Sequence, residues 1–363
     1  MIMNKPLFIV CISFIFLFST STLCATEKFG IISKNERWTA ENSPYIISDD
    51  ILISENARVT ITPGVQILVG KPISFKSGIE QIDHLDSFTI SIKVKGALKC
   101  VGRSENRIIF SSQPGDLKRC QWYGIILDSE RGDEIEVAFC DIGNACNALT
   151  VTKGSPLIRN CIFEQNNVGI FCSGKSTAKV YNCIIAHNLT TGIRIQKANP
   201  SIVNNIIAFN KGNGIWSDNL SHVDIEYNGI SDNVDGNLQG CNPELGVIKR
   251  VNKNKDSTDF AHNIYINPIF AGSPADSEAV EKDVSLQTDK SRVKDTTIAK
   301  MFHDTLTDST ATKWIARDYK RYSLSKYSPC INAGNPKKQF KDMDGSRNDM
   351  GIFGGQEFVG FSK

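Results

Sequence analysis

Asparagine recurs at a nearly constant interval through the middle of the 363-residue chain. Asn144, Asn166, Asn188, Asn210 and Asn233 are spaced 22, 22, 22 and 23 residues apart, and a Gly-Ile pair follows three of them. Closely related segments lead up to the three central asparagines: IRNCIFEQN, VYNCIIAHN and IVNNIIAFN. A unit of this length with short alternating runs leaves no room for a helix of ten or more residues. It predicts one turn of a parallel β-helix, in which each repeat is one coil.

Identical side chains at one position of successive coils are expected to stack, because neighbouring strands lie about 4.8 Å apart. A second recurring asparagine, at Asn160, Asn182 and Asn204, is therefore predicted to form an amide ladder at a turn. Cys161 and Cys183 stack by the same reasoning. We expect buried unpaired thiols there, with a disulfide between them as the alternative, and stacked core cysteines rather than a disulfide framework in the whole chain.

The alternating pattern continues upstream with less regularity. Residues 46–245 are therefore predicted to form roughly nine coils around one long core, in place of the two or three domains that the length allows. The expected fold class is all-β, a parallel β-helix solenoid. Residues 26–45 are assigned to an N-terminal cap.

The first 25 residues differ from the rest of the chain. Lys5 precedes an apolar run from Leu7 to Phe18, and small polar residues lead to Ala25. This pattern predicts a signal peptide over residues 1–25, and so an exported protein located outside the cell, in the periplasm or on the cell surface. The apolar run is shorter than the roughly 20 residues of a membrane span. Cys24 leaves lipidation open as an alternative.

Charge is nearly balanced over the chain, with 41 basic and 39 acidic residues. A net charge of +2 offers no electrostatic footprint for nucleic acid or for an anionic membrane. Any partner must therefore be recognised by a local patch of side chains.

Several longer segments carry a resemblance to a known family. The stretches TAENSPYIISDDILISENARVTITPGVQILVG (residues 39–70) and IKVKGALKCVGRSENRIIFSSQ (residues 92–113) resemble the first coils of bacterial secreted right-handed parallel β-helix proteins. The central coils are similar to the repeats shared with pectate lyases and polygalacturonases. The segments SPCINAGNP (328–336) and DMDGSRNDMGIFGG (342–355) resemble the closing cassette of the same secreted group.

This resemblance implies a right-handed parallel β-helix with a C-terminal capping segment. It assigns residues 321–363 to a closing cassette and residues 246–320 to an irregular polar insertion. It implies architecture rather than activity, since the fold carries lyases, hydrolases, epimerases, adhesins and inert scaffolds alike.

One candidate binding surface follows from the register of the repeats. If the isoleucine after each glycine points inward, Phe171, Arg194 and Trp216 form one outward row, and Ser173, Gln196 and Asp218 form the next. Aromatic faces stack on sugar rings, and arginine pairs with a uronate carboxylate. We therefore predict an acidic polysaccharide or cell-surface glycan as partner, bound by Phe171, Arg194, Gln196, Trp216 and Asp218. Scattered exposed side chains without a ligand are the alternative.

The sequence leaves catalysis open. A lyase would need a base, for which Arg194 is the candidate, together with carboxylates such as Asp218 that hold calcium. The nearby carboxylates do not fall on one outward row, however. A glycoside hydrolase is less favoured, because the paired carboxylates that it needs are missing from the coils. The rival hypothesis is a structural or adhesive surface protein without catalysis.

No cofactor is expected, apart from a weak calcium candidate near the C-terminus. Asp342, Asp344 and Asp349 surround Gly345 as in part of a calcium loop, but the glutamate that would complete such a loop is missing. A capping turn is the favoured interpretation. The five histidines show no metal-ligand spacing, and the oligomeric state stays open.

Overall fold

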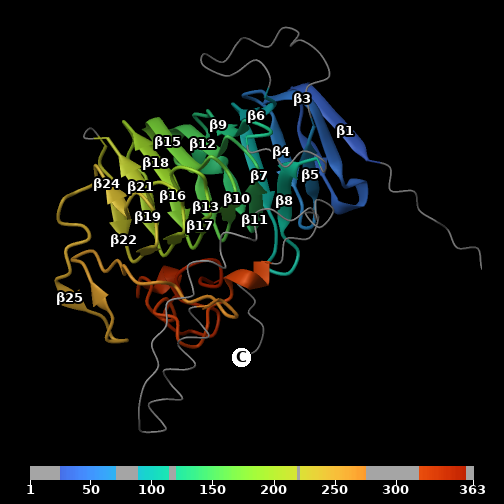
Figure 1. Ribbon diagram of the computed structural model, residues 1–363. Coiled ribbons are helices and arrows are strands. Elements are labelled where there is room, and N and C mark those ends of the chain that lie inside the picture. The colour runs from blue at the N-terminus through green and yellow to red at the C-terminus, as the bar shows by residue number, and fades with distance from the viewer. Residues whose placement is uncertain (1–24, 71–88, 114–119, 219–220, 275–318, 357–363) are drawn as a thin grey trace, which may run out of the picture.

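The computed structural model describes residues 25–70, 89–113, 120–218, 221–274 and 319–356. They form a rod of stacked coils, with the C-terminal segment lying along one flank of the rod (Figure 1). The described strands pair in parallel, apart from one small antiparallel pair and short bridges, and Pro274 is the one described residue in α-helical conformation. The predicted all-β parallel solenoid is confirmed. The predicted signal peptide lies outside the described residues.

Each complete coil contributes three strands, and each strand pairs with its counterpart in the next coil, which gives the rod three faces. Face one consists of β6 (Ser91–Val94), β9 (Gly124–Leu127), β12 (Asn147–Gly154), β15 (Val168–Ser176), β18 (Ile193–Gln196), β21 (Ile215–Ser217) and β24 (Leu238–Gln239). Face two consists of β2 (Glu36–Trp38), β4 (Arg58–Ile61), β7 (Ala97–Val101), β10 (Glu136–Ala138), β13 (Leu157–Arg159), β16 (Lys179–Tyr181), β19 (Ser201–Val203) and β22 (Asp224–Glu226). Face three consists of β5 (Gln66–Val69), β8 (Ile108–Ser112), β11 (Cys140–Gly143), β14 (Ile162–Glu164), β17 (Ile184–Ala186), β20 (Ile206–Ala208) and β23 (Gly229–Ser231).

The solenoid begins earlier than the sequence pattern suggested. β1 (Thr26–Ile32) pairs in parallel with β3 (Tyr45–Ile53), which in turn pairs with both β5 and β6. Residues 26–45, which we assigned to a cap, thus already supply β1 and β2, with η1 (Ala40–Asn42) between β2 and β3. The remaining short elements are η2 (Gly132–Glu134), η4 (Tyr319–Tyr322), η5 (Lys338–Phe340) and the antiparallel pair β25 (Arg250–Val251) and β26 (Ser257–Thr258).

The region assigned to a polar insertion, residues 246–320, is not uniformly irregular. Asn263 and Ile264 continue the stacking of the coils, since the Asn263 side chain accepts a hydrogen bond from Asn228 N (2.9 Å) and Ile264 bridges to Gly229. Most of the insertion, residues 275–318, lies outside the described part of the chain.

Successive side chains of each strand point alternately into and out of the rod, and the inward ones are mostly β-branched. Ile170, Ile193 and Ile215 follow one another on face one and are fully buried. The Gly-Ile pairs have a steric cause, because a Cβ on Gly192 would lie 2.7 Å from Gly214 O and 2.9 Å from Asn210 Nδ2. Only glycine allows the next coil to approach this closely.

The asparagine ladder exists, but at a different position from the one we predicted. Asn166, Asn188, Asn210 and Asn233 are all buried, and the side-chain oxygen of each of the last three accepts hydrogen bonds from the backbone and side-chain nitrogens of the asparagine one coil earlier. Asn144 is not part of it, because Ala145 N is the group that bonds to Asn166 Oδ1 (3.0 Å). A second ladder runs through Asn205, Asn228 and Asn263.

The prediction that Asn160, Asn182 and Asn204 stack as an amide ladder was wrong. All three have positive φ angles of 51°, 51° and 61°, so they adopt the left-handed conformation at the turn between faces two and three. Their side chains bond to the C-terminal segment instead. Asn182 Nδ2 lies 3.0 Å from Asn348 Oδ1 and 3.1 Å from Gly351 O, and Asn204 Oδ1 accepts from Asn335 N at 2.7 Å.

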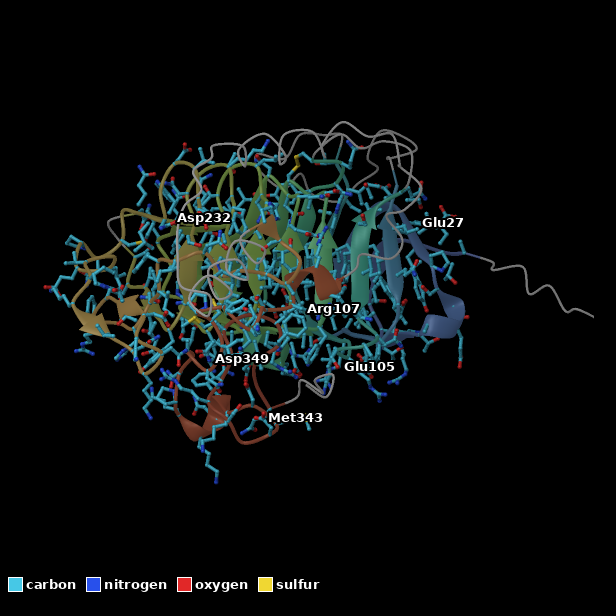
Figure 2. All side chains as sticks on the ribbon, turned by 60° about the horizontal axis from the view of Figure 1, so that its bottom comes forward. Glu27, Glu105, Arg107, Asp232, Met343 and Asp349 are labelled. Carbon is cyan, nitrogen blue, oxygen red and sulfur yellow. A yellow bond between two sulfur atoms is a disulfide. The ribbon has the colours of Figure 1, made fainter. Side chains whose placement is uncertain are left out.

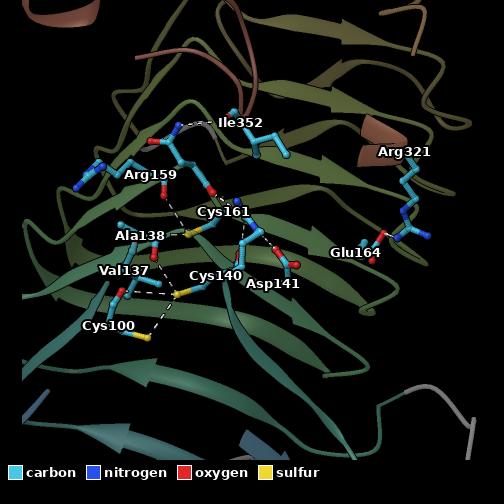
Figure 3. Close-up of polar contacts among 12 residues, drawn as sticks. Cys100, Val137, Ala138, Cys140, Asp141, Arg159, Cys161, Glu164, Arg321 and Ile352 are labelled. Carbon is cyan, nitrogen blue, oxygen red and sulfur yellow. Dashed lines mark hydrogen bonds and ion pairs between the residues drawn. The ribbon is translucent and has the colours of Figure 1, made fainter. Parts of the chain in front are cut away.

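The C-terminal segment covers the flank of face three rather than an end of the rod. Ile162, Ile184 and Ile206 stack on the outer side of this face and are buried together with Cys330, Met350 and Ile352. At the upstream end of this segment, Arg321 donates a hydrogen bond to Glu164 (Figure 3). Tyr322 donates a second one to the same carboxylate. The strands β14, β17 and β20 of face three are therefore buried on both sides, which explains apolar runs such as CIIA at residues 183–186.

The cysteines mostly follow the prediction of buried thiols. Cys140, Cys161 and Cys183 occupy one register position on consecutive coils, and no disulfide joins Cys161 to Cys183. Cys100 lies close to Cys140, with 3.4 Å between the sulfur atoms (Figure 3). The structure adds one disulfide that the sequence did not suggest, between Cys120 and Cys146.

Candidate functional site

The predicted aromatic and arginine row lies on face one, as the register implied. Phe171 on β15 is opposite Arg194 on β18, which is opposite Trp216 on β21. The three strands are consecutive in the rod (Figure 1). Arg194 is exposed, whereas the two aromatic side chains are half-buried.

Arg194 is held between the two rings. Its guanidinium carbon lies 5.2 Å from the centre of the Phe171 ring and 5.4 Å from that of Trp216. No hydrogen bond or ion pair joins the guanidinium to another residue in the described part of the chain. Both faces of the cation are thus occupied, and its N–H groups remain available at the exposed edge. This arrangement fixes a donor fork that fits a planar carboxylate.

The same contacts change the role of the aromatic residues. We expected the rings to offer their faces to a sugar, but one face of each ring is taken by Arg194. Phe171 and Trp216 therefore position the arginine, and the charged edge becomes the main recognition element of the row.

The second predicted row is only partly available to a ligand. Ser173 and Gln196 are register partners, and Gln196 is exposed. Asp218 instead belongs to a turn, where its carboxylate accepts hydrogen bonds from Lys197 N (2.8 Å) and Ser221 Oγ (2.6 Å). These bonds favour a carboxylate that fixes the turn rather than one that acts as a base.

Three lysines that the sequence reasoning missed complete this surface. Lys153, Lys175 and Lys197 are spaced 22 residues apart, and this interval was the signal that could have identified them. Lys153 and Lys175 are register partners. Asn199 N donates to Ser176 O (2.9 Å) in the same way as Thr177 N donates to Gly154 O one coil earlier. Asn199 therefore occupies the position of Thr177 one coil later, and Lys197, two residues before Asn199, lies beside Lys175 in the same row. Lys175 and Lys197 are exposed.

A cavity of about 610 Å³ opens at the turn that follows Trp216. Asp218, His222 and Asp224 line it from the last coil, and Cys241 and Asn242 line it from the loop after β24. The cavity thus lies beside the downstream end of the arginine row, where the stack of face-one strands ends.

The other carboxylates near the site do not converge. Asp232 accepts a hydrogen bond from Asn267, and Glu226 accepts one from Asn335 of the C-terminal segment. Burial, with a contribution from the neighbouring Asp224, raises the pKa of Glu226. Among the described residues, no group of three or more His, Cys, Asp and Glu side chains is arranged to hold a metal ion.

The weak calcium candidate lies in the C-terminal segment, on which Met343 and Asp349 are labelled in Figure 2. Its carboxylates accept backbone N–H groups: Asp342 from Gly355 (2.7 Å), Asp344 from Ser346 (2.9 Å) and Asp349 from Asn332 (2.7 Å). Burial, together with the nearby Asp349 and Asp344 charges, raises the pKa of Asp342 to about 7. This geometry is that of capped turns.

His187 is partly exposed but contacts two aromatic rings. Its ring stacks on Phe209, with 5.3 Å between the ring centres, and burial lowers its pKa. It packs under Tyr322 of the C-terminal segment, so it belongs to the face-three contact and not to the face-one site.

Comparisons with known proteins support the architecture. Residues 106–244 match the family described as "Right handed beta helix region". A search of curated proteins finds no significant match. Among solved structures, the chain resembles a mutant of the periplasmic alginate epimerase AlgG, with 14% sequence identity and a TM-score of 0.30; the alignment covers 57% of this chain and 62% of that one.

The chain thus spans less than two thirds of the epimerase, and this likeness is too distant to assign an activity. No helix within the described ranges is long and apolar enough to cross a membrane. The coil stack shows that the described part of the chain has the parallel β-helix architecture, and the match of residues 106–244 to the right-handed β-helix family agrees with it.

Proposed function

We propose that this protein is exported and binds an acidic polysaccharide on face one, with Arg194 as the central recognition residue. The observation that carries the proposal is the guanidinium held between Phe171 and Trp216 with its N–H edge exposed. A positioned fork of donors recognises a carboxylate in two bonds at once, which a flexible lysine cannot do. Gln196, two residues along the same strand, offers an amide for sugar hydroxyls.

The proposal concerns binding, and it assigns no reaction. Arg194 remains the candidate base for a lyase, but Asp218 is engaged in a turn and does not face Arg194 as a partner carboxylate would. This engagement of Asp218 favours a non-catalytic surface protein, because the carboxylate is then not available to act together with Arg194. An assay for unsaturated uronate products separates the two: product formation that Arg194→Ala abolishes would establish a lyase.

Binding is tested with an array of acidic and neutral polysaccharides. We expect the wild-type chain to retain acidic polymers only, Arg194→Ala to lose at least about tenfold in affinity, and Arg194→Lys to recover little of it, because a point charge does not reproduce the fork. Lys211→Ala, on a different turn, serves as the matched control for loss of one positive charge. Unchanged binding by Arg194→Ala would rule out this site.

A further inference from the structure

On face one, the outward positions of the two central coils are cationic or neutral. β15 and the turn after it present Phe171, Ser173 and Lys175, and β18 with its turn presents Arg194, Gln196 and Lys197. These positions hold three cations and no carboxylate. The surface therefore has three parallel lines along the rod: the arginine row, a row of hydrogen-bonding groups, and the lysine row.

Two lysines elsewhere on face one are paired with carboxylates. Lys93 lies 3.3 Å from Asp128, and Lys153 lies 3.6 Å from Asp128 and 3.4 Å from Glu130. The attraction of Asp128 is the largest cause of the raised pKa of Lys153. By contrast, Lys175 and Lys197 make no ion pair with any residue in the described ranges. Lys175 and Lys197 thus carry uncompensated positive charge on the two consecutive coils that present Phe171 and Arg194.

The backbone presents these two lysines outward by specific means. Gly174 has a φ of +63° and is the extra residue of β15 at the register shift beside β12, so Lys175 stays in line with Lys153. Lys197 has a φ of 54°, and its N–H is fixed by Asp218, so its side chain leaves the strand at the turn. The Asp218 turn therefore positions Lys197.

Like charges on neighbouring strands repel each other, and the repulsion is relieved when an anion lies between them. Successive lysines of the row are one coil apart, about 4.8 Å. Arg194 and Lys197 are three residues apart, about 10 Å along the strand, so the row of hydrogen-bonding groups lies between the arginine row and the lysine row.

We infer that Lys175 and Lys197 form a second anion-binding row for the same ligand, whose class is a polyanion with acidic groups on neighbouring sugar residues. This inference rests on the proposed function, since Arg194 supplies the first contact. A polymer with only occasional acidic residues would satisfy Arg194 and leave the lysine row unpaired. Selectivity for dense charge is thus assigned to the lysines, and recognition of a single carboxylate to the arginine.

The test compares polygalacturonate, which has a carboxylate on every residue, with the same polymer after partial methyl esterification. Titrations at several salt concentrations use the full chain, the double variant Lys175→Gln/Lys197→Gln, and the control Lys179→Gln/Lys211→Gln, which removes two exposed charges outside the lysine row. We expect the first pair to weaken binding of polygalacturonate about three- to tenfold and to flatten its salt dependence, with little change for the esterified polymer. The control pair should behave as wild type.

The outcomes separate the two ideas. If Arg194→Ala loses binding while Lys175→Gln/Lys197→Gln keeps wild-type affinity and salt dependence, the lysine row is refuted and the proposed function stands. Equal losses in the two double variants would also refute it, because they would reflect net charge alone. Binding that survives Arg194→Ala, or a wild-type chain that retains neither polymer, overturns the proposed function together with this inference.

Discussion

At the scale of single residues, the buried amide ladder is the feature most sensitive to substitution. Asn188 accepts hydrogen bonds from Asn166 N and Nδ2, and donates to Phe163 O (3.1 Å) and Asn210 Oδ1 (2.9 Å). Asn188→Leu fits the volume but removes all of these side-chain hydrogen bonds from a buried site. We expect the free energy of unfolding to fall by at least about 1–3 kcal/mol in chemical denaturation.

Asn144→Leu is the control for that substitution. Asn144 belongs to the same 22-residue series but bonds only to the hydroxyls of Ser111 and Ser112 and is partly exposed. A loss of stability as large as that of Asn188→Leu would contradict the ladder.

The spacing in the sequence predicted that asparagines stack, but not which ones. Asn160 and Asn166 recur with the same period, and period alone cannot distinguish a side chain that points into the coil from one that points out. The difference is conformational: Asn160 and its counterparts have positive φ, whereas Asn166 does not. The Arg194 row was predictable because strict alternation fixes the direction of each side chain on a strand.

At the scale of elements, the C-terminal segment is a separate layer on face three. Asn182→Leu removes bonds to Asn348, Asp349 and Gly351 while leaving the ladder of Asn166 and Asn188 intact. Hydrogen exchange should therefore show faster exchange in residues 328–355 and unchanged protection in β14, β17 and β20. Equal loss of protection in the strands would mean that the segment and the coils open as one unit.

The docking of this segment was not predictable in detail. Its turn-rich sequence, with Asp342 and Gly345, indicated a closing cassette, but the partner surface is built from residues more than 100 positions earlier. The signal in the sequence was the run of consecutive apolar residues on face three. A strand with one side in water would alternate apolar and polar residues instead.

At the scale of the whole molecule, one continuous core extends from Ile32 to Ile230. The free cysteines report on its cooperativity, because Cys140, Cys161 and Cys183 lie within it and Cys241 lies at its downstream end, half-buried. Thiol labelling during denaturation should modify the three core cysteines at the midpoint seen by circular dichroism.

Cys241 should react before them, because it is only half-buried. Its labelling rate should rise with pH, because burial raises the pKa of its thiol to about 11 and the thiolate is the reactive form. Labelling of Cys161 well below the unfolding midpoint would show that individual coils separate independently.

The three asparagines under the C-terminal segment have a consequence for biosynthesis. Asn160, Asn182 and Asn204 sit on consecutive coils, and the segment bonds to all of them at once. It can dock only after those coils have stacked at the correct spacing. This segment is synthesised after the coils that it covers, so its docking depends on those coils being in register. An assembly with a slipped coil would leave the segment unattached and open to proteolysis.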